Sequence, residues 1–337
     1  MPSAQPPAKV LVTGANGFLA LHIVKQLLEQ NYIVRGTVRS AAKGEWIRSK
    51  FSEFGASFDF VVVQDITKEG AFDRAIEGVD AVIHTASPVP DNFLGTYDNV
   101  YIPAVRSAES IFKSLLNSPT VKRVVFTSSI VAMSMAGAHE RGYTYSESDW
   151  NDGASSWVKE APHDKPHPRF YFAAKTDAEH TAWNFYEQHK AEMKWDLVTL
   201  TPPYIFGPIL QDEPNFSANL VYRKALEQKP ADQVGLHAGF WIDVRDCARG
   251  HVLSLQKEEA GAERIFITGG ALTWQEVYDE LQSLNIPEIP KERVDDGDVK
   301  DVANTSKATG ILGLTYRTLG ESVRDTITVL RQRENQK

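Results

Sequence analysis

A tyrosine followed four residues later by a lysine occurs twice in the stretch RFYFAAKTDAEHTAWNFYEQHKAEM, residues 169–193. The first pair is Tyr171 with Lys175, and the second is Tyr186 with Lys190. Residues four apart lie on one face of a helix, where an ammonium stabilises the phenolate and lowers the phenol pKa. Such a phenol can give its proton to a carbonyl oxygen as hydride arrives at the carbon. The alternative is a pair of ordinary residues on a solvated helix face.

The position of each pair along the chain separates the two interpretations. Fifteen residues of helix span about 22 Å, so both pairs cannot serve one site. Tyr171 follows a long predicted loop that would cross the mouth of a cleft, whereas Tyr186 is followed by the polar residues 187–189. Two serines, Ser128 and Ser129, end the apolar run VVFTSS, and a serine hydroxyl there can orient the same carbonyl oxygen. We therefore predict that Tyr171 is reactive and that Tyr186 lies on a solvated helix end.

A glycine turn near the start of the chain predicts a dinucleotide site. Gly14, Gly17 and Ala20 are spaced three apart between an apolar strand at 9–12 and a helical stretch near 17–30. Gly14 allows the tight turn, and Gly17 lets backbone N–H groups approach a pyrophosphate at the helix N-terminus. Ala20 takes the third small position, where helix and strand pack closely. Because further strand–helix units follow, we favour this interpretation over a simple tight turn.

The end of the second strand indicates which dinucleotide is bound. NAD sites usually carry an acid there for the ribose 2′-hydroxyl, but this chain reads VRGTVRSAAKG at 34–44. Arg39 can make a bidentate, charge-assisted contact with a 2′-phosphate, and Lys43 adds a point charge. Arg35 alternates to the other side of the strand and is expected to be a surface cation. The predicted cofactor is NADPH.

Alternation of short apolar strands with helices predicts an α/β fold. The expected strands are 9–12, 33–38, 58–63, 81–85, 124–128 and 197–201, and the expected helices lie near 17–30, 41–54, 69–77 and 98–117. Nearly continuous apolar strands indicate a parallel sheet covered on both faces, a doubly wound Rossmann sheet. Residues 139–169 are predicted to form a long loop, and short helices are expected near 213–228, 244–257 and 273–284.

Two parts follow from this pattern. Residues 1–201 are predicted to be mainly an NADP-binding Rossmann domain. Residues 202–337 are predicted to be mainly a smaller C-terminal substrate-binding lobe, with some segments returning to the Rossmann domain. Ligands in open α/β sheets bind beyond the carboxyl ends of the strands, so the lobe would cover the site.

Composition narrows the class of protein. The 337 residues carry a formal net charge of −8, which gives no reason to expect a nucleic-acid or acidic-membrane partner. The single cysteine, Cys247, excludes an intrachain disulfide and is expected to be a small core residue. The start MPSAQPPAKV has no apolar signal segment, and no apolar run approaches the roughly 18–20 residues that span a bilayer. We expect a cytoplasmic protein.

Two polar motifs are not expected to be catalytic. His163 and His167 in HDKPHP are four apart, but the two prolines exclude a helix and no cluster of ligands completes a metal shell. Asp243 precedes a helical stretch and is expected to be an N-cap. No metal site is predicted.

Several longer motifs extend these observations over nearly the whole chain. They are VLVTGANGF at 10–18, HTASP at 84–88, VVFTSS at 124–129, YFAAKTDAEHTAW at 171–183, PPYIFGP at 202–208 and IDVRDCARGHV at 242–252. With these motifs the chain resembles the extended short-chain dehydrogenases/reductases, and within them the dihydroflavonol-reductase-like branch. That branch includes yeast and fungal NADPH-dependent aldehyde and carbonyl reductases.

The resemblance implies roles for individual residues. Ser129 matches the catalytic serine, Tyr171 the proton donor, and Lys175 the residue that bonds the nicotinamide ribose and shifts the tyrosine pKa. It also implies Arg39 at the 2′-phosphate, Asp65 and Ile66 at the adenine, and Pro202 through Ile205 at the nicotinamide ring. The full predicted cofactor contact set is Gly14, Asn16, Gly17, Phe18, Leu19, Arg39, Lys43, Asp65, Ile66, Thr85, Ala86, Ser87, Tyr171, Lys175, Pro202 and Ile205.

Departures from the branch bear on the substrate. Flavonoid reductases carry an asparagine five residues after the catalytic serine, where this chain has Ser134. Cinnamoyl-CoA reductases carry Asn-Trp-Tyr-Cys-Tyr-Gly-Lys around the catalytic pair, where this chain has RFYFAAK. Neither plant specificity is indicated. The predicted pocket residues are mostly apolar, which favours an alkyl or aryl carbonyl substrate; they are Val89, Ile130, Met133, Ser134, Phe170 and Tyr204.

The sequence therefore predicts an NADPH-dependent reductase of aldehydes or ketones, a monomer or homodimer acting on small molecules. One alternative is an NDP-sugar epimerase or dehydratase, which usually retains NAD and prefers an acid at the end of the second strand. A second alternative is a non-catalytic NADPH-binding regulator, although such proteins typically lose the tyrosine or the lysine.

Overall fold

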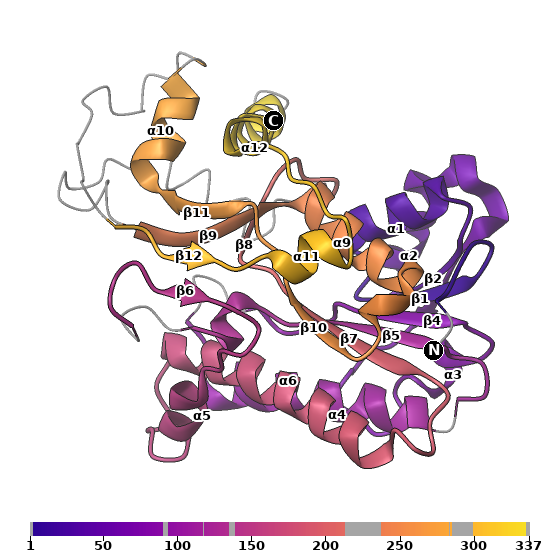
Figure 1. Cartoon of the computed structure of the whole chain (residues 1–337). Helices are drawn as coiled ribbons and strands as arrows, with labels where there is room; N and C mark the ends of the chain where they lie inside the picture. Colours follow the sequence, from indigo (N-terminus) through magenta and orange to yellow (C-terminus); the bar gives the residue numbers. More distant parts are fainter. Residues whose placement is uncertain are drawn as a thin grey trace.

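A seven-stranded parallel sheet forms the centre of the protein in a computed structural model that describes residues 3–89, 94–116, 118–134, 139–212, 237–282, 284 and 299–334 (Figure 1). The order of its strands is β10-β7-β5-β4-β1-β2-β3, and every neighbouring pair is parallel. The strands are β1 (Lys9–Thr13), β2 (Ile33–Val38), β3 (Phe58–Val62), β4 (Ala81–His84), β5 (Arg123–Thr127), β7 (Asp196–Thr201) and β10 (Glu263–Phe266). The order reverses between β1 and β4, the point at which ligands bind in such sheets. The predicted doubly wound Rossmann sheet is confirmed.

Helices cover both faces of this sheet because neighbouring strand residues point to opposite sides. One face packs against α1 (Phe18–Glu29), α2 (Ala41–Lys50) and α9 (Val244–Gln256), with Val10 and Val12 inside this core. The other face packs against α3 (Asp73–Ile76), α4 (Ile102–Leu116) and α6 (Pro168–His189), with Leu11 inside that core. Figure 1 shows α4 and α6 side by side below the sheet, and α1 and α9 packed together above it.

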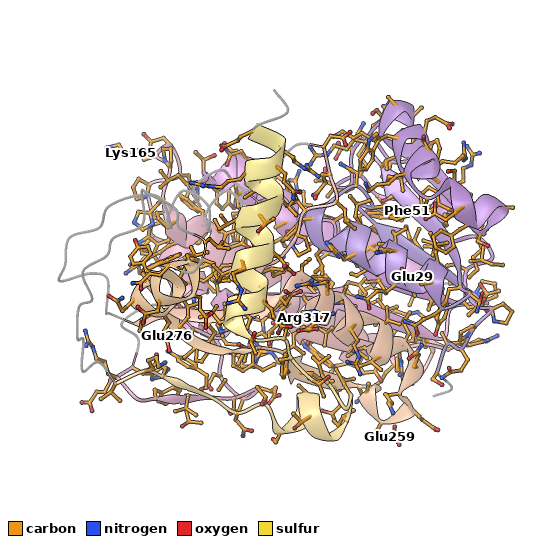
Figure 2. All side chains as sticks on the ribbon, turned by 90° about the horizontal axis from the view of Figure 1, so that it is seen from above. Glu29, Phe51, Lys165, Glu259, Glu276 and Arg317 are labelled. Atoms are coloured by element: carbon orange, nitrogen blue, oxygen red, sulfur yellow. The ribbon has the colours of Figure 1, made fainter. Side chains whose placement is uncertain are left out.

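Three further strands form a separate sheet in the second half of the chain. It has the order β11-β9-β8, built from β8 (Tyr204–Phe206), β9 (His237–Asp243) and β11 (Gly270–Thr273). A small apolar core joins this sheet to α10 (Trp274–Gln282) and α12 (Leu319–Glu334). Seen from above, α12 lies between Glu276 of α10 on one side and Glu29 at the end of α1 on the other (Figure 2). Other segments after residue 201, α9 and β10, pack on or within the main sheet instead.

The prediction of a long loop at 139–169 is wrong. The stretch contains β6 (Thr144–Tyr145) and α5 (Asp152–Val158), and α6 begins in it at Pro168. Local patterns do not reveal the strand because its parallel partner, β12 (Val302–Ala303), is remote in sequence. The short helix α5 relies on its N-cap, because Asn151 Oδ1 accepts from Ala154 N at 3.3 Å. The helix expected near 213–228 lies outside the described residues.

Two smaller predictions on α9 are confirmed. Asp243 is the N-cap of this helix and accepts a hydrogen bond from Arg245 N at 2.8 Å. Cys247 is fully buried, and burial raises the pKa of its thiol, as expected for a core residue. Asp246, which also lies on α9, accepts a hydrogen bond from the backbone N–H of Arg317, labelled in Figure 2. This bond ties the segment before α12 to α9.

A buried ion pair locks β5 and β7 to the returning segments. Arg123 is fully buried and makes two 2.7 Å hydrogen bonds to the carboxylate of Asp196. Its guanidinium also donates to the carbonyls of Ser254, Lys257 and Glu258, at the end of α9 and just beyond it. All of these acceptors are needed because a guanidinium without partners in the core is strongly destabilising.

Substitution of Asp196 by Asn should lower the free energy of unfolding by about 3–5 kcal/mol, because Arg123 is left as an uncompensated buried charge. The matched control is Glu45→Gln, which removes the exposed Glu45–Arg48 pair on α2 and should cost only about 0–1 kcal/mol. Urea unfolding of the two variants and the wild type measures both effects. Equal losses in the two variants would contradict a special role for the buried pair.

Candidate active site

A cavity of about 1880 Å³ lies at the carboxyl ends of the central strands. Its wall runs from the glycine turn after β1, past the ends of β2, β4 and β5, to β8 and β9. Pockets for drug-sized ligands typically measure about 300–1,000 Å³, so this volume accommodates a dinucleotide together with a small substrate. The cavity lies at the point where the strand order reverses.

The glycine turn has the geometry that the sequence predicts. Gly14 has a φ of +63°, and a Cβ there would lie 3.3 Å from Ala86 of the adjacent loop. A Cβ on Gly17, the N-cap of α1, would lie 3.2 Å from Gly14 O. The first N–H groups of a helix have no carbonyl partner inside it, and this helix begins at the cavity wall. The turn therefore leaves room for an anion at the start of α1.

A buried hydrogen-bond cluster fixes the loop opposite the turn. Thr13 Oγ1 accepts from the backbone N–H groups of Thr85 and Ala86, each at 3.0 Å, and lies 3.1 Å from His84 Nδ1. With its lone pairs used by the two amides, the threonine hydroxyl must donate to His84. Burial, and then the charge of Lys175, lower the pKa of His84 to about 3, so the ring is neutral. This cluster holds Thr85 and Ala86 against the cavity.

The cations on and after β2 differ in what they contact. Arg39 and Lys43 are exposed side chains on the cavity wall, and neither is ion-paired within the described part of the chain. Both are therefore available to an anionic ligand.

The expectation that Arg35 is a surface cation is wrong. Its side chain is only 15% exposed and forms an ion pair with Asp59 at 3.3 Å. It also donates to the carbonyls of Ala75 and Glu77, and so holds β2 to neighbouring segments. The partners of the Arg35 guanidinium come from β3 and from α3 and the residues just after it. The spacing of residues on β2 cannot reveal these contacts.

Most of the predicted cofactor contact set lines the cavity, but Asp65 does not. Its exposed carboxylate accepts from the backbone N–H and the hydroxyl of Thr67, at 2.9 and 2.6 Å. Ile66 and Val63 line the wall at this end instead. The remaining members of the predicted set all lie on the wall: Gly14, Asn16, Gly17, Phe18, Leu19, Arg39, Lys43, Ile66, Thr85, Ala86, Ser87, Tyr171, Lys175, Pro202 and Ile205.

Ser129 and Tyr171 both line the cavity wall. The two side chains are close enough for Ser129 to lower the pKa of the Tyr171 phenol. Ser129 is placed by the extension of β5 alongside β7, where Ile130 N donates to Pro202 O at 3.0 Å. The start of α6 is fixed by its N-cap, His167, whose backbone N–H donates to Gly95 O at 2.8 Å.

Lys175 lies one turn after Tyr171 and is almost entirely buried, with 7% of its surface exposed. Its Nζ donates to Thr127 O at 3.4 Å. The Thr127 side chain is fixed in turn by His251, whose Nε2 lies 2.8 Å from Thr127 Oγ1 and whose Nδ1 lies 2.8 Å from Cys247 O. Since a carbonyl only accepts, Nδ1 carries the proton and Nε2 accepts from the threonine.

Burial dominates the pKa values of the central pair. It raises the pKa of Tyr171 to about 12, against a lowering by the hydrogen bond to Ser129. It lowers the pKa of Lys175 to about 8, against a raising by Glu179. The spacing of the pair predicts that the ammonium lowers the phenol pKa, whereas in this structure burial raises it and the opposing lowering comes from Ser129. Tyr171 is therefore held as a protonated donor near neutral pH.

The second pair is not at this site, although the reason differs from the prediction. Tyr186 is buried, with 8% exposed, and packs against Trp183 and Trp195 in the core below the sheet. Lys190 is exposed and bonds Glu187. The prediction of a solvated helix end holds for Lys190 but is wrong for Tyr186, which is a core residue because α6 turns this face toward α4 and the sheet.

The predicted substrate pocket is partly corrected. Val89, Ile130, Ser134 and Tyr204 line the cavity. Met133 and Phe170 do not, and each is at most 1% exposed. Met133 packs in a cluster with Tyr145 and Phe240, and Phe170 packs beneath α5. Both residues are close in sequence to residues of the cavity wall, but their side chains point away from the cavity. The sequence alone does not reveal that direction.

Several further wall residues are not indicated by the sequence. Phe240 and Tyr145 add aromatic surface, and Ser134 Oγ donates to Tyr145 OH at 2.7 Å. Arg141 and Asp301 also line the wall. These residues come from β6, β9 and connecting segments brought together by remote pairing, so no local spacing identifies them.

The histidines of HDKPHP have structural contacts. The His163 ring stacks on Tyr97 with centroids 3.8 Å apart, and His167 caps α6. Across the described residues, no group of three or more His, Cys, Asp or Glu side chains is placed to hold a metal ion.

The chain belongs to the NAD dependent epimerase/dehydratase family, whose sequence profile matches residues 10–269. With the parallel sheet, the glycine cradle and the Ser129–Tyr171–Lys175 cluster, this confirms the resemblance to extended short-chain dehydrogenases/reductases.

Individual relatives lie within the same group. The chain is 32% identical to the NADPH-dependent methylglyoxal reductase of Saccharomyces cerevisiae, over 94% of this chain and 96% of that protein. It is 31% identical to aldehyde reductase 2 of Sporidiobolus salmonicolor, over 94% of each. The crystal structure of yeast methylglyoxal/isovaleraldehyde reductase complexed with NADPH matches with a TM-score of 0.85 and 30% identity, covering 98% of this chain and all of that one.

Three buried histidines make the fold sensitive to acid. Burial lowers the pKa of His22 and His251 to about 4 and that of His84 to about 3. An unfolded chain takes up these protons near its ordinary pKa of about 6.5, so stability is lost as pH falls below that value. The free energy of unfolding should fall by up to roughly 1.4 kcal/mol per pH unit for each histidine. Urea unfolding between about pH 7 and 5 measures this slope, and a flat profile would contradict it.

Proposed function

We propose that this protein is an NADPH-dependent reductase that converts aldehydes or ketones to alcohols. The observation that carries the proposal is the placing of Ser129, Tyr171 and the buried Lys175 together on the wall of a cavity that begins at the glycine turn. The methylglyoxal and aldehyde reductases to which the chain is similar support it.

The residues present fit NADPH. A Cβ at Gly14 or Gly17 would fill the cradle, so the glycines leave room for a pyrophosphate against the start of α1. The end of β2 offers Arg39 and Lys43, both free of ion pairs among the described residues, for a 2′-phosphate. Bound NADPH supplies the hydride that reduces the carbonyl carbon.

Side chains of this protein protonate and orient the carbonyl oxygen of the substrate. As negative charge develops there, Tyr171 gives it the phenolic proton and Ser129 orients it with its hydroxyl. The buried ammonium of Lys175 stabilises the phenolate that remains. A phenol with a pKa of about 12 is protonated before the reaction, as a donor must be.

The substrate end of the cavity favours an alkyl or aryl carbonyl compound. Val89, Ile130, Tyr204 and Phe240 give it a largely apolar wall. Polar side chains line the wall as well: Ser134 and Tyr145, whose hydroxyls bond each other, and Arg141 and Asp301. The apolar part of the wall suits the alkyl or aryl group that carries the carbonyl.

The size of the cavity and the character of its wall suit a small molecule as the partner. No helix in the described ranges is long and apolar enough to cross a bilayer. We propose a cytoplasmic enzyme that works as a monomer or homodimer, in which residues 1–201 mainly bind the cofactor and residues 202–337 mainly the substrate.

Two other functions are less well supported. An NDP-sugar epimerase would prefer an acid at the end of β2, where this chain has Arg39. A non-catalytic NADPH-binding regulator has no need of the complete serine, tyrosine and lysine set. NADPH binding without turnover across a broad carbonyl panel would favour the regulator, and cofactor retained through purification would favour the epimerase.

Tyr171→Phe should lower kcat/KM by about 10²- to 10⁴-fold, because the proton donor is lost while the ring stays in place. The matched control is Tyr186→Phe, which removes the hydroxyl of the other pair and should keep nearly wild-type activity. NADPH consumption with aldehydes, diketones and aryl ketones measures activity, and fluorescence titration checks that all three proteins bind NADPH. If all three bind NADPH and consume none, the reductase proposal is wrong.

Arg39→Gln should raise KM for NADPH by roughly tenfold or more and leave KM for NADH little changed, because only the charge-assisted contact to the 2′-phosphate is lost. The matched control is Arg35→Gln, four residues earlier on β2, whose guanidinium bonds Asp59 and two carbonyls away from the cavity wall. It should leave both KM values unchanged. Steady-state kinetics with each cofactor measures the effect, and equal changes for NADPH and NADH in Arg39→Gln would count against the assignment.

A further inference from the structure

A buried carboxylate, that of Glu179, lies one helical turn beyond Lys175 on α6. It is fully buried and is not part of the cavity wall. Its oxygens accept hydrogen bonds from Ser128 Oγ at 2.6 Å and from Thr199 Oγ1 at 2.8 Å. Residues four apart share a helix face, so Tyr171, Lys175 and Glu179 form one row pointing at the ends of the strands.

Arg264 on β10 compensates the charge of this carboxylate. Its guanidinium donates to the two oxygens of Glu179 at 2.9 and 3.1 Å. The same group donates to the carbonyls of Glu147 and Asp149 and lies 3.6 Å from the centroid of the Trp150 ring. Figure 1 shows β10 beside β7 at the edge of the main sheet, so this cation reaches α6 from the returning part of the chain.

The other titratable groups around Lys175 do not carry a compensating negative charge. His84 at the end of β4 is neutral, and Tyr171 is protonated. Burial raises the pKa of Tyr204 on β8, so this phenol is protonated as well. On the other side of α6, Asp177 accepts a hydrogen bond from Tyr101 at 2.8 Å. Among the described residues, Glu179 is the carboxylate that raises the pKa of Lys175.

We propose that Glu179 is a positioning residue that keeps Lys175 charged and holds the strand end carrying Ser128 and Ser129, with Arg264 tempering its charge. The inference rests on the proposed roles of Ser129, Tyr171 and Lys175. A carboxylate one turn away opposes the effect of burial on the ammonium, whereas a guanidinium adds to it. Removing Glu179 and removing Arg264 should therefore move the charge state of Lys175 in opposite directions.

The test measures Lys175 directly in the protein without cofactor. Lysine labelled with ¹³C at Cε is titrated by NMR, and Lys175→Met identifies the resonance. In Glu179→Gln the pKa of Lys175 should fall by about one pH unit, and in Arg264→Gln it should rise. Thr199→Val is the matched control, because it removes a hydrogen bond to Glu179 and leaves both charges in place, so the pKa should stay near the wild-type value.

The kinetic readout follows from the same shifts. In Glu179→Gln, the loss of kcat at alkaline pH should begin at lower pH, with KM for the carbonyl substrate nearly unchanged. Circular dichroism and thermal unfolding establish that each variant is folded. Equal shifts in both charge variants, or none in either, would overturn the inference. Because the NMR titration needs no turnover, a wild-type protein that reduces no carbonyl would refute the proposed function and still leave this test valid.

Discussion

Burial of the Lys175 ammonium at the carboxyl edge of the parallel sheet is the constraint on which the site depends. Removing water from a charge is costly, and the surrounding groups are arranged to offset that cost. Thr127 offers its carbonyl, and Glu179 offers a negative charge one turn away. Each of these residues has its own fixed partner, His251 in one case and Arg264 in the other. One buried charge thus organises residues from β5, α6, α9 and β10.

The two ends of the cavity are built by different physical means. At the end proposed to bind the cofactor, the wall is fixed by main-chain groups of the glycine turn and by the hydroxyl of Thr13, which bonds residues of the adjacent loop. At the end proposed to bind the substrate, the wall comes from short strands that pair with remote segments, as β6 does with β12. The cofactor end of the cavity therefore suits the pyrophosphate that all such dinucleotides carry. The wall at the substrate end can change in shape without disturbing the main sheet.

This difference explains how far the sequence can predict the structure. The glycine turn, six of the seven strands of the main sheet and the Tyr171–Lys175 pair follow from local periodicity and spacing. The strands β10 and β6 do not, because each is short and depends on a partner far away in the chain. Spacing also misplaces Met133 and Phe170, since it gives a residue's neighbourhood but not the direction of its side chain. The polar residues that follow Tyr186 in the sequence indicate an exposed side chain, although Tyr186 lies on the buried face of α6.

The ion pair of Arg123 also has a consequence for the way the chain is made. Its carboxylate partner lies on β7, but the carbonyls that complete its shell belong to Ser254, Lys257 and Glu258. During synthesis from the N-terminus, at about 5–20 residues per second, the strands of the main sheet up to β7 emerge several seconds before those carbonyls do. For that interval the nascent sheet holds a guanidinium that has its carboxylate partner but lacks its three carbonyl acceptors. The main sheet can therefore reach its final packing only after those later residues have been translated.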